Sequence, residues 1–164
     1  MSVDYERKLQ NKVKHWLIDD LGYIFLGNLE DRYNTPVKEE LLIANLKKRG
    51  YKKEQITKAV AELRTAVSNQ ADTLYQVNKA VYALLRYGLQ GVKDAAGHRD
   101  TVHYIDWTDA GKRSNDFYVA EEVTVLRYDR TTTKRPDLIL YVNGIALGMF
   151  ELKRSCVSVG EGIR

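Results

Sequence analysis

Two apolar segments joined by the dipeptide Asn143-Gly144 constrain the fold of this chain more than any other feature. Residues 138–142 and 145–152 are rich in Leu, Ile, Val and Phe, and Asn-Gly is a strong short-range signal of a β-hairpin turn. Both faces of this hairpin are largely apolar, which is typical of strands in a sheet covered on both sides. Helical patterns earlier in the chain supply candidates for that cover.

Those helical patterns occupy the first half of the sequence. Apolar residues recur at helical spacing in four segments, which are residues 3–20, the segment between Thr35-Pro36 and Gly50, residues 56–67 and residues 74–85. Gly22 and Gly88 are expected helix ends, while Thr35 is expected as an N-cap and Pro36 as a first helical residue. From about Gly91 the pattern becomes β-rich, with strands predicted over 101–107 and 117–126 and a polar loop over 109–114.

Composition excludes several classes of protein. With 44% hydrophobic and 29% charged residues over 164 positions, the chain is typical of one globular domain, so we expect a single domain over residues 1–164. No apolar run approaches the ~18 residues of a membrane span, and the charged start is unlike a signal peptide. Cys156 is the only cysteine, which excludes an intrachain disulfide and a multi-thiolate zinc site and makes a cytoplasmic location the default.

Two weaker features concern partners and completeness. The net charge of +4 is compatible with a nucleic-acid partner but supports one only weakly, and the 11 tyrosines could stack on bases, although scattered tyrosines usually fill cores and edges. The sequence stops inside what the pattern indicates is the start of a further helix. We therefore expect a fragment truncated at its C-terminal end.

Charged side chains gather at the open end of the predicted hairpin. Asp137 precedes the first segment, while Glu151 and Lys153 share one face of the second because residues two apart on a strand point the same way. Two carboxylates and the backbone carbonyl of Leu152 are oxygen ligands of the kind Mg²⁺ prefers, and Lys153 could orient an attacking water. On pattern alone, a metal-dependent nuclease and an ordinary structural sheet are equal alternatives.

The turn decides whether Asp137 joins Glu151. A strict two-residue turn pairs Val142 with Ile145 and puts Asp137 on the wrong face for Glu151. A type I turn followed by a G1 bulge shifts the register by one residue and puts both carboxylates on one face. The nuclease interpretation therefore predicts a bulged or odd-length hairpin.

Glu6 lies on the inward-facing stripe of the first predicted helix. It either lies in the first helical turn as a structural residue, where a carboxylate interacts favourably with the helix dipole, or points toward a metal site. The sequence leaves both interpretations open.

Several short motifs are similar to those of a known enzyme family. They are Leu21-Gly22-Tyr23, the segment 78–91 with Leu85-Arg86 and Gly88, Asn115-Asp116-Phe117, Val123-Thr124-Val125, Arg135-Pro136-Asp137, Val142-Asn143-Gly144-Ile145, Glu151-Leu152-Lys153 and residues 158–164. On these motifs nearly the whole chain resembles the N-terminal nuclease domain of the R (restriction) subunit of type I restriction-modification enzymes, in the PD-(D/E)xK superfamily. The resemblance implies an α/β fold with a restriction-endonuclease-like core, in which helices flank a central mixed β-sheet, and an N-terminal helical portion.

The resemblance also implies an activity and a set of site residues. The expected activity is that of a type I site-specific deoxyribonuclease, a metal-dependent endonuclease that hydrolyses phosphodiester bonds of foreign double-stranded DNA. Asp137 and Glu151 correspond to the metal ligands, with the Leu152 carbonyl beside them, and Lys153 corresponds to the catalytic lysine. Glu6 resembles a carboxylate that some superfamily members add. The expected cofactor is Mg²⁺, with Mn²⁺ as a substitute.

Further expectations concern DNA and partner subunits. Arg135, Arg154 and Arg164 are candidate DNA contacts, although Arg154 stands where the family usually has Asn, and the glutamine and tyrosine that the family places beyond Arg164 are absent. In the family, an ATP-driven motor lies downstream and the R subunit assembles with modification and specificity subunits. No Gly-x-x-x-x-Gly-Lys-Ser/Thr loop occurs here, so ATP is expected only through those downstream domains.

Two alternatives remain beside this interpretation. One is a stand-alone repair-type nuclease of the same superfamily, which the absence of a downstream motor would indicate. The other is a degenerate nuclease fold that serves as a DNA-binding or assembly module, against which the intact Asp137, Glu151 and Lys153 argue.

Overall fold

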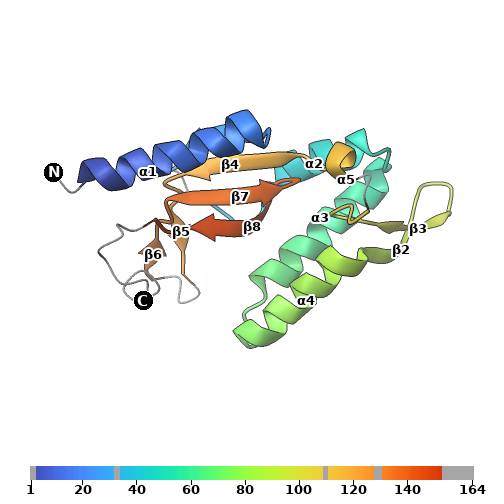
Figure 1. The fold of residues 1–164 in the computed structure, drawn as a ribbon. Coiled ribbons are helices and arrows are strands. Elements are labelled where there is room, and N and C mark those ends of the chain that lie inside the picture. The colour runs from blue at the N-terminus through green and yellow to red at the C-terminus, as the bar shows by residue number, and fades with distance from the viewer. Residues whose placement is uncertain (1–2, 32–33, 109–110, 128–130, 153–164) are drawn as a thin grey trace. The chain divides into compact units, whose positions relative to one another are not determined.

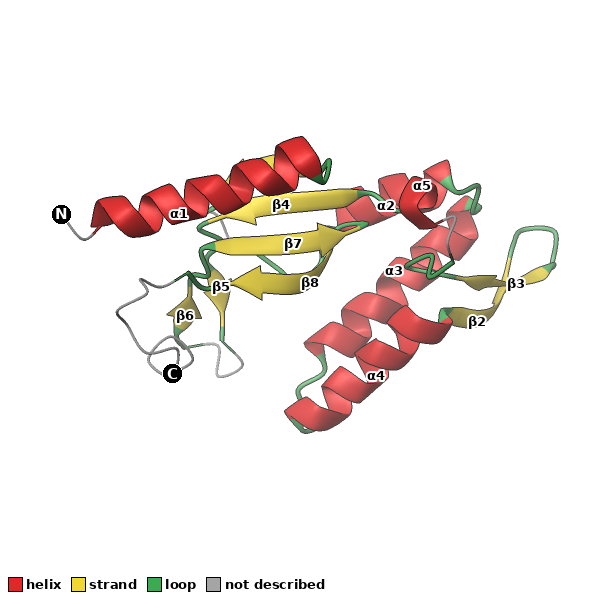
Figure 2. Cartoon of the chain, in the orientation of Figure 1, coloured by secondary structure: helices red, strands yellow, loops and turns green. Residues whose placement is uncertain are grey.

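A computed structural model describes residues 3–31, 34–108, 111–127 and 131–152, which fall into two compact units (Figure 1). Unit 1 comprises the described residues of Met1–Thr35, Phe117–Tyr141 and Ala146–Arg164, and unit 2 those of Pro36–Asp116 and Val142–Ile145. Helices and strands occur in both, so the fold is α/β, as the resemblance implied (Figure 2). The prediction of one domain over residues 1–164 stays a prediction.

Unit 1 is built on a four-stranded sheet. Its strands, in spatial order, are β1 (Ile24–Asn28), β4 (Phe117–Glu121), β7 (Leu138–Val142) and β8 (Ile145–Phe150). β1 and β4 run parallel, whereas the arrows of β7 and β8 point in opposite directions (Figure 1), so the sheet is mixed as predicted. A separate antiparallel pair is formed by β5 (Val125–Leu126) and β6 (Thr133–Lys134).

A long helical segment covers one face of this sheet. α1 (Val3–His15) continues into the π-helical turn η1 (Trp16–Asp20), so the helix predicted over 3–20 is confirmed, and Gly22 follows with a φ of 71°. The segment is amphipathic, and its apolar side packs on strand residues because burial of that side removes apolar surface from water. The core here contains Leu17, Val119 and Leu138, with Val13, Ile18, Tyr23, Leu140 and Phe150 packed against it.

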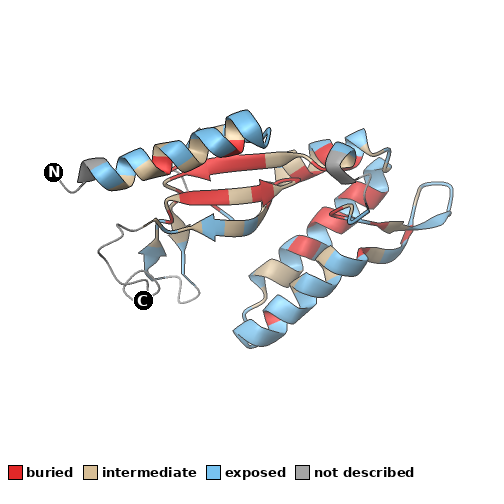
Figure 3. Cartoon of the chain, in the orientation of Figure 1, coloured by how far each residue is buried: buried red, intermediate tan, exposed pale blue. Residues whose placement is uncertain are grey.

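The edge strand β8 departs from the prediction that both hairpin faces are covered. Leu147 is 45% exposed and Met149 55% exposed, whereas β4 and most of β7 are buried or half-buried (Figure 3). β8 lies at the end of the strand order and has one described neighbour in the sheet. Alternate residues therefore face outward, as in a half-covered strand.

Unit 2 is mainly helical. Its elements are α2 (Glu39–Lys48), α3 (Lys53–Ser68), α4 (Leu74–Tyr87), the antiparallel strands β2 (Leu89–Lys93) and β3 (Arg99–Val102), and the short helix α5 (Gly111–Ser114). The core is formed by Leu42, Leu46, Ile56, Ala59, Val60, Leu63, Val92, Val102, Tyr104, Ile105 and Ile145. The strand predicted over 101–107 is shorter and begins earlier, and part of the loop predicted over 109–114 is helical.

The helix boundaries in unit 2 test the capping predictions. α4 ends before Gly88, which has a φ of 77°, as predicted, and Thr73 caps its start by accepting a hydrogen bond from the Gln76 N–H. The prediction of Thr35 as an N-cap is wrong, because α2 begins at Glu39. None of the helices in the described ranges combines the length and apolar character of a membrane span.

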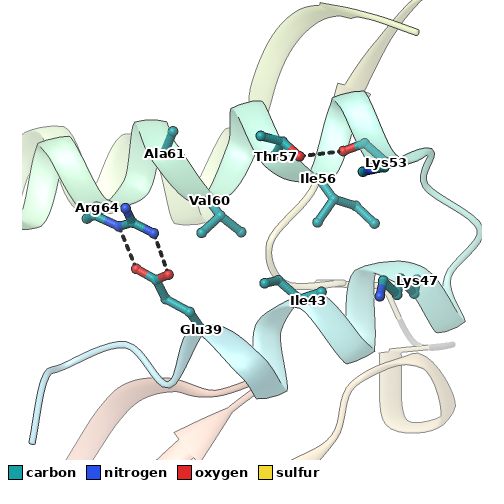
Figure 4. A pocket seen from close by; sticks show the side chains of 9 residues that line it. All are labelled: Glu39, Ile43, Lys47, Lys53, Ile56, Thr57, Val60, Ala61 and Arg64. Carbon is teal, nitrogen blue, oxygen red and sulfur yellow. Dashed lines mark hydrogen bonds and ion pairs between the residues drawn. The ribbon is translucent and has the colours of Figure 1, made fainter. Parts of the chain in front are cut away.

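A hollow of about 370 Å³ opens between α2 and α3 (Figure 4). Its apolar lining includes Ile43, Ile56 and Val60, and an ion pair borders it where Arg64 donates two hydrogen bonds to the Glu39 carboxylate, at 2.5 and 2.6 Å. These bonds raise the pKa of Arg64.

Asn143 and Gly144 form the predicted turn, and a polar network in unit 2 anchors it. The Asn143 side chain is fully buried, donates to the Tyr104 carbonyl and to Asn115 Oδ1, both at 2.9 Å, and accepts from the Asp116 N–H at 2.7 Å. Two motifs of the family resemblance, one around Asn115-Asp116 and one around Asn143-Gly144, thus meet in space. Their role here is to hold backbone segments together.

Candidate active site

The type of the hairpin turn differs from the prediction. The φ of Asn143 is 53° and that of Gly144 is 85°, and positive φ at both central residues is the signature of a two-residue type I′ turn. A type I turn with a G1 bulge would place only the glycine in this region, so the predicted bulged turn is wrong. A two-residue turn pairs Val142 with Ile145, which would separate Asp137 from Glu151 if both lay within the strands.

Neither carboxylate lies within a strand, however. β7 begins at Leu138, directly after Asp137, and β8 ends at Phe150, directly before Glu151. The alternation of side chains between faces holds only inside regular strands. Local contacts therefore decide where these two side chains point.

The Asp137 carboxylate points toward the end of β8. Its Oδ2 accepts a hydrogen bond from the Leu152 backbone N–H at 2.5 Å. This bond brings one predicted metal ligand against the peptide unit that joins Glu151, the other ligand, to Leu152. Asp137 is half-buried and Glu151 is exposed.

Two neighbouring elements hold the backbone of Asp137. Its carbonyl accepts from the Glu122 N–H at 3.1 Å and from Gln10 Nε2 at 3.2 Å. Gln10 is only 4% exposed and also donates to the Glu122 carboxylate at 3.2 Å. Its amide therefore links α1 to the segments that follow β4 and precede β7.

Glu6 lies on the same side of α1 as Gln10. Residues four apart on a helix are neighbours on its surface, so Glu6, Gln10 and Lys14 form one polar row. Gln10 contacts Asp137, which places the half-buried Glu6 on the row that faces this region. Glu6 is also the fourth residue of α1 and lies in its first turn. Both interpretations of this carboxylate therefore stay open.

Two acidic residues that sequence reasoning missed lie at the end of β4. Glu121 is 6% exposed and accepts a hydrogen bond from Lys14 Nζ at 2.8 Å, and the Lys14 ammonium also lies 5.0 Å from the centre of the Phe25 ring. Glu122 has a φ of 52°, which is uncommon outside glycine, and lies 3.3 Å from Arg7 Nη1. The signal available in the sequence was a pair of carboxylates directly after an apolar strand.

These two carboxylates already have cationic partners. Arg135 Nε lies 3.2 Å from Glu122 Oε2, and the Arg135 guanidinium also pairs with Glu30. Arg135, a candidate DNA contact, is thus half exposed and held in an ion-pair network. Its role in DNA contact stays a prediction. Lys153, Arg154 and Arg164 lie outside the described residues.

The donor set can be compared with the needs of Mg²⁺. No group of three or more His, Cys, Asp or Glu side chains within the described ranges is arranged to hold a metal ion. The predicted set differs, since it consists of two carboxylates and one backbone carbonyl. The Asp137 carboxylate accepts from the Leu152 N–H, and Glu151 directly precedes Leu152. By type of donor these two carboxylates fit a hard cation, because Mg²⁺ binds one or two carboxylates and keeps several waters.

Comparison with known proteins places the chain in a family. The family model described as type I restriction enzyme R protein N terminus (HSDR_N) matches residues 5–164. No curated protein matches the chain, and no solved structure matches it.

Proposed function

This chain belongs to the family of type I restriction enzyme R protein N-termini, and on that premise we propose that it is a metal-dependent nuclease domain acting on double-stranded DNA. The observation that carries the proposal is the hydrogen bond from the Leu152 N–H to the Asp137 carboxylate at 2.5 Å. It joins the Pro-Asp motif to the Glu-x-Lys motif, which are 14 residues apart between Asp137 and Glu151.

The proposed roles follow from the chemistry of each group. Asp137 and Glu151 would hold Mg²⁺ or Mn²⁺, with the Leu152 carbonyl as a third oxygen ligand. The bound cation would supply a more acidic water and would neutralise charge on the phosphate. Lys153 would orient the attacking water and stabilise the negative charge that builds up in the transition state.

The surrounding residues would position these groups. Gln10 and the Glu122 N–H fix the Asp137 carbonyl, and through it the backbone that carries the carboxylate. Such support matters because a catalytic group displaced by about 1 Å can lose about 100-fold in rate. Arg135 would contact a DNA phosphate with the part of its guanidinium that remains exposed.

The family also supports proposals about partners. We expect the domain to work within an R subunit that assembles with modification and specificity subunits. ATP would act only through motor domains of that subunit. Base recognition would lie with other subunits, and this domain would contact mainly the phosphate backbone.

Metal binding gives the first test of the proposal. Calorimetry with Mn²⁺ should detect binding to the chain, and Asp137→Asn and Glu151→Gln should each weaken it at least tenfold. Asp20→Asn is a matched control, because Asp20 is an exposed carboxylate at the end of η1. Equal Mn²⁺ binding by the wild type and Asp137→Asn, with unchanged circular dichroism, would refute the metal site and favour a binding or assembly module.

Cleavage gives the second test. In the R subunit assembled with its partners, Lys153→Ala should abolish cutting of plasmid DNA and leave Mn²⁺ binding in place. Retained cutting by this variant would remove the lysine from the mechanism.

A further inference from the structure

Two tyrosines on α4 lie at the surface of unit 2. Tyr75 is 75% exposed and Tyr82 is 61% exposed. They are seven residues apart, which is close to two helical turns, so both rings project from nearly the same side of the helix. Tyrosines usually fill cores and edges, and these two do neither.

Cationic residues alternate with the tyrosines along that side. Lys79 follows Tyr75 by four residues, and Arg86 follows Tyr82 by four, so all four side chains share one row. The opposite side of α4 is apolar and contributes Val77, Val81, Leu84 and Leu85 to the core or its margin. The row is therefore the solvent side of an amphipathic helix.

Trp107 extends the row at the C-terminal end of α4. Its indole N–H donates to the Leu85 carbonyl at 2.8 Å, and the Arg86 guanidinium lies 5.9 Å from the centre of its ring. The ring is 54% exposed in spite of these contacts. Tyr75, Lys79, Tyr82, Arg86 and Trp107 together form what we call the α4 stripe.

The charged side chains of α4 are all positive. α4 contains no Asp or Glu, and no ion pair joins Lys79 to a described acidic residue. Cations that alternate with exposed aromatic rings are the combination that binds single-stranded nucleic acid, because cations meet phosphates while rings stack on bases. A protein partner would need acidic groups in register with Lys79 and Arg86, whereas a polyanion supplies them at every nucleotide.

We propose that the α4 stripe binds single-stranded nucleic acid, with Lys79 and Arg86 at phosphates and Tyr75, Tyr82 and Trp107 stacked on bases. The two tyrosines are about 10 Å apart along the helix axis, from a rise of about 1.5 Å per residue. That span corresponds to about three nucleotides of a strand with about 3.4 Å per nucleotide. The inference does not depend on the proposed nuclease activity, since it involves neither the metal nor the residues around Asp137.

Fluorescence anisotropy with labelled oligo-dT of about 20 nucleotides, in EDTA at low salt, tests the proposal on the full chain. The double variant Tyr75→Ala/Tyr82→Ala should bind about tenfold more weakly or worse, whereas Tyr82→Phe should bind like the wild type, because phenylalanine keeps the stacking face. Tyr87→Ala is the matched control, since Tyr87 is a 61% exposed tyrosine of α4 that lies off the stripe. A duplex of the same length should bind more weakly, because its bases already stack on one another.

Two further measurements separate the contribution of phosphate contacts from that of base stacking. Lys79→Ala should reduce the slope of log affinity against log salt by about 0.7, the value for one phosphate contact on a single strand. In a Trp16→Phe background, oligo-dT should quench the fluorescence of Trp107. Asp137→Asn should bind oligo-dT like the wild type, which distinguishes a failure here from a failure of the nuclease proposal. Equal binding by the double tyrosine variant and the wild type, or no binding at low salt, would overturn the inference and leave a protein partner as the occupant of the stripe.

Discussion

Replacement of Asn143 by alanine should remove a fully buried set of polar contacts from the hairpin turn. The side chain makes three hydrogen bonds of 2.7 to 2.9 Å, two as a donor to Tyr104 and Asn115 and one as an acceptor from Asp116. Its exposure is 0%, so water does not replace a lost partner without rearrangement of the loops. The turn is therefore a sensitive point of unit 2.

The expected loss of stability follows from these contacts. A hydrogen bond contributes about 1 kcal/mol net, and a buried group left without its partner costs about 1–3 kcal/mol. Three lost bonds with partial relaxation give about 3–5 kcal/mol. Alanine at a φ of 53° adds about 1 kcal/mol, because asparagine tolerates the left-handed region better than alanine does. This is a large part of the about 5–15 kcal/mol that stabilises a typical domain.

Urea unfolding followed by circular dichroism measures this loss. With a slope of about 2 kcal/mol per molar urea, the midpoint should fall by about 2–3 M. Asn78→Ala, a change at an exposed asparagine of α4, is the control and should stay within about 0.5 kcal/mol of the wild type. Asn143→Asp keeps the volume and the acceptor but loses both donors, so it should also be strongly destabilised. A loss below about 1 kcal/mol for Asn143→Ala, or wild-type stability of Asn143→Asp, would refute the role of these hydrogen bonds.

Three other changes probe different parts of the fold. Gly144→Ala should lower the melting temperature and cost more than about 2 kcal/mol, because its φ is 85° and an added Cβ would lie 2.5 Å from a backbone carbonyl; an unchanged melting curve would exclude this crowding. Lys14→Met should cost about 3 kcal/mol in urea unfolding, because it takes from the buried Glu121 carboxylate the ammonium at 2.8 Å and leaves it only the more distant Arg7 guanidinium, at 3.8 Å. The double variant with Glu121→Gln should recover most of that loss, and additive losses would argue against the pair. Hydrogen bonds from Ser114 and from Thr108 lower the pKa of Asp106 from 3.8 to about 2. Because the pKa is lowered, the ionised Asp106 stabilises the fold above pH 3.8, and this stabilisation is lost as the pH falls through about 2. Ser114→Ala should raise the pKa of Asp106 in an NMR titration. An unchanged titration would show that the serine hydroxyl has no such effect.

Local signals predicted several elements correctly. The helix over 3–20 and the end of α4 at Gly88 depend on apolar periodicity and on glycine conformation, both of which act within a few residues. The start of α2 was predicted wrongly because a non-local contact overrides the Thr35-Pro36 signal. Lys38 N–H donates to the Gly144 carbonyl at 2.7 Å, and Val37 forms an antiparallel bridge with Ile145, so this segment is extended where a helix start was expected.

The hairpin likewise combines a feature that local signals predicted with one that non-local contacts decide. Asn-Gly correctly predicted a turn, but the sequence allowed both a type I′ turn and a bulged turn. The buried hydrogen bonds of the Asn143 side chain to Tyr104 and Asn115 accompany the positive φ of 53°. Those partners are 39 and 28 residues away in sequence, beyond the reach of any local rule.

The candidate site consists of residues just beyond the ends of strands, where the regular alternation of side chains between the two faces no longer applies. Sequence spacing identified Asp137 and Glu151 as candidates, but the face argument that joined them assumed that both lie inside strands. In the structure both lie one residue outside, and the Leu152 N–H brings the Asp137 carboxylate to the end of β8 in spite of the two-residue turn. The direction of this carboxylate is thus set by hydrogen bonds from Leu152 and, through the backbone, from Gln10. A change in Gln10 should therefore alter the position of Asp137 without removing any proposed metal ligand, because Gln10 acts on the site through the backbone of Asp137.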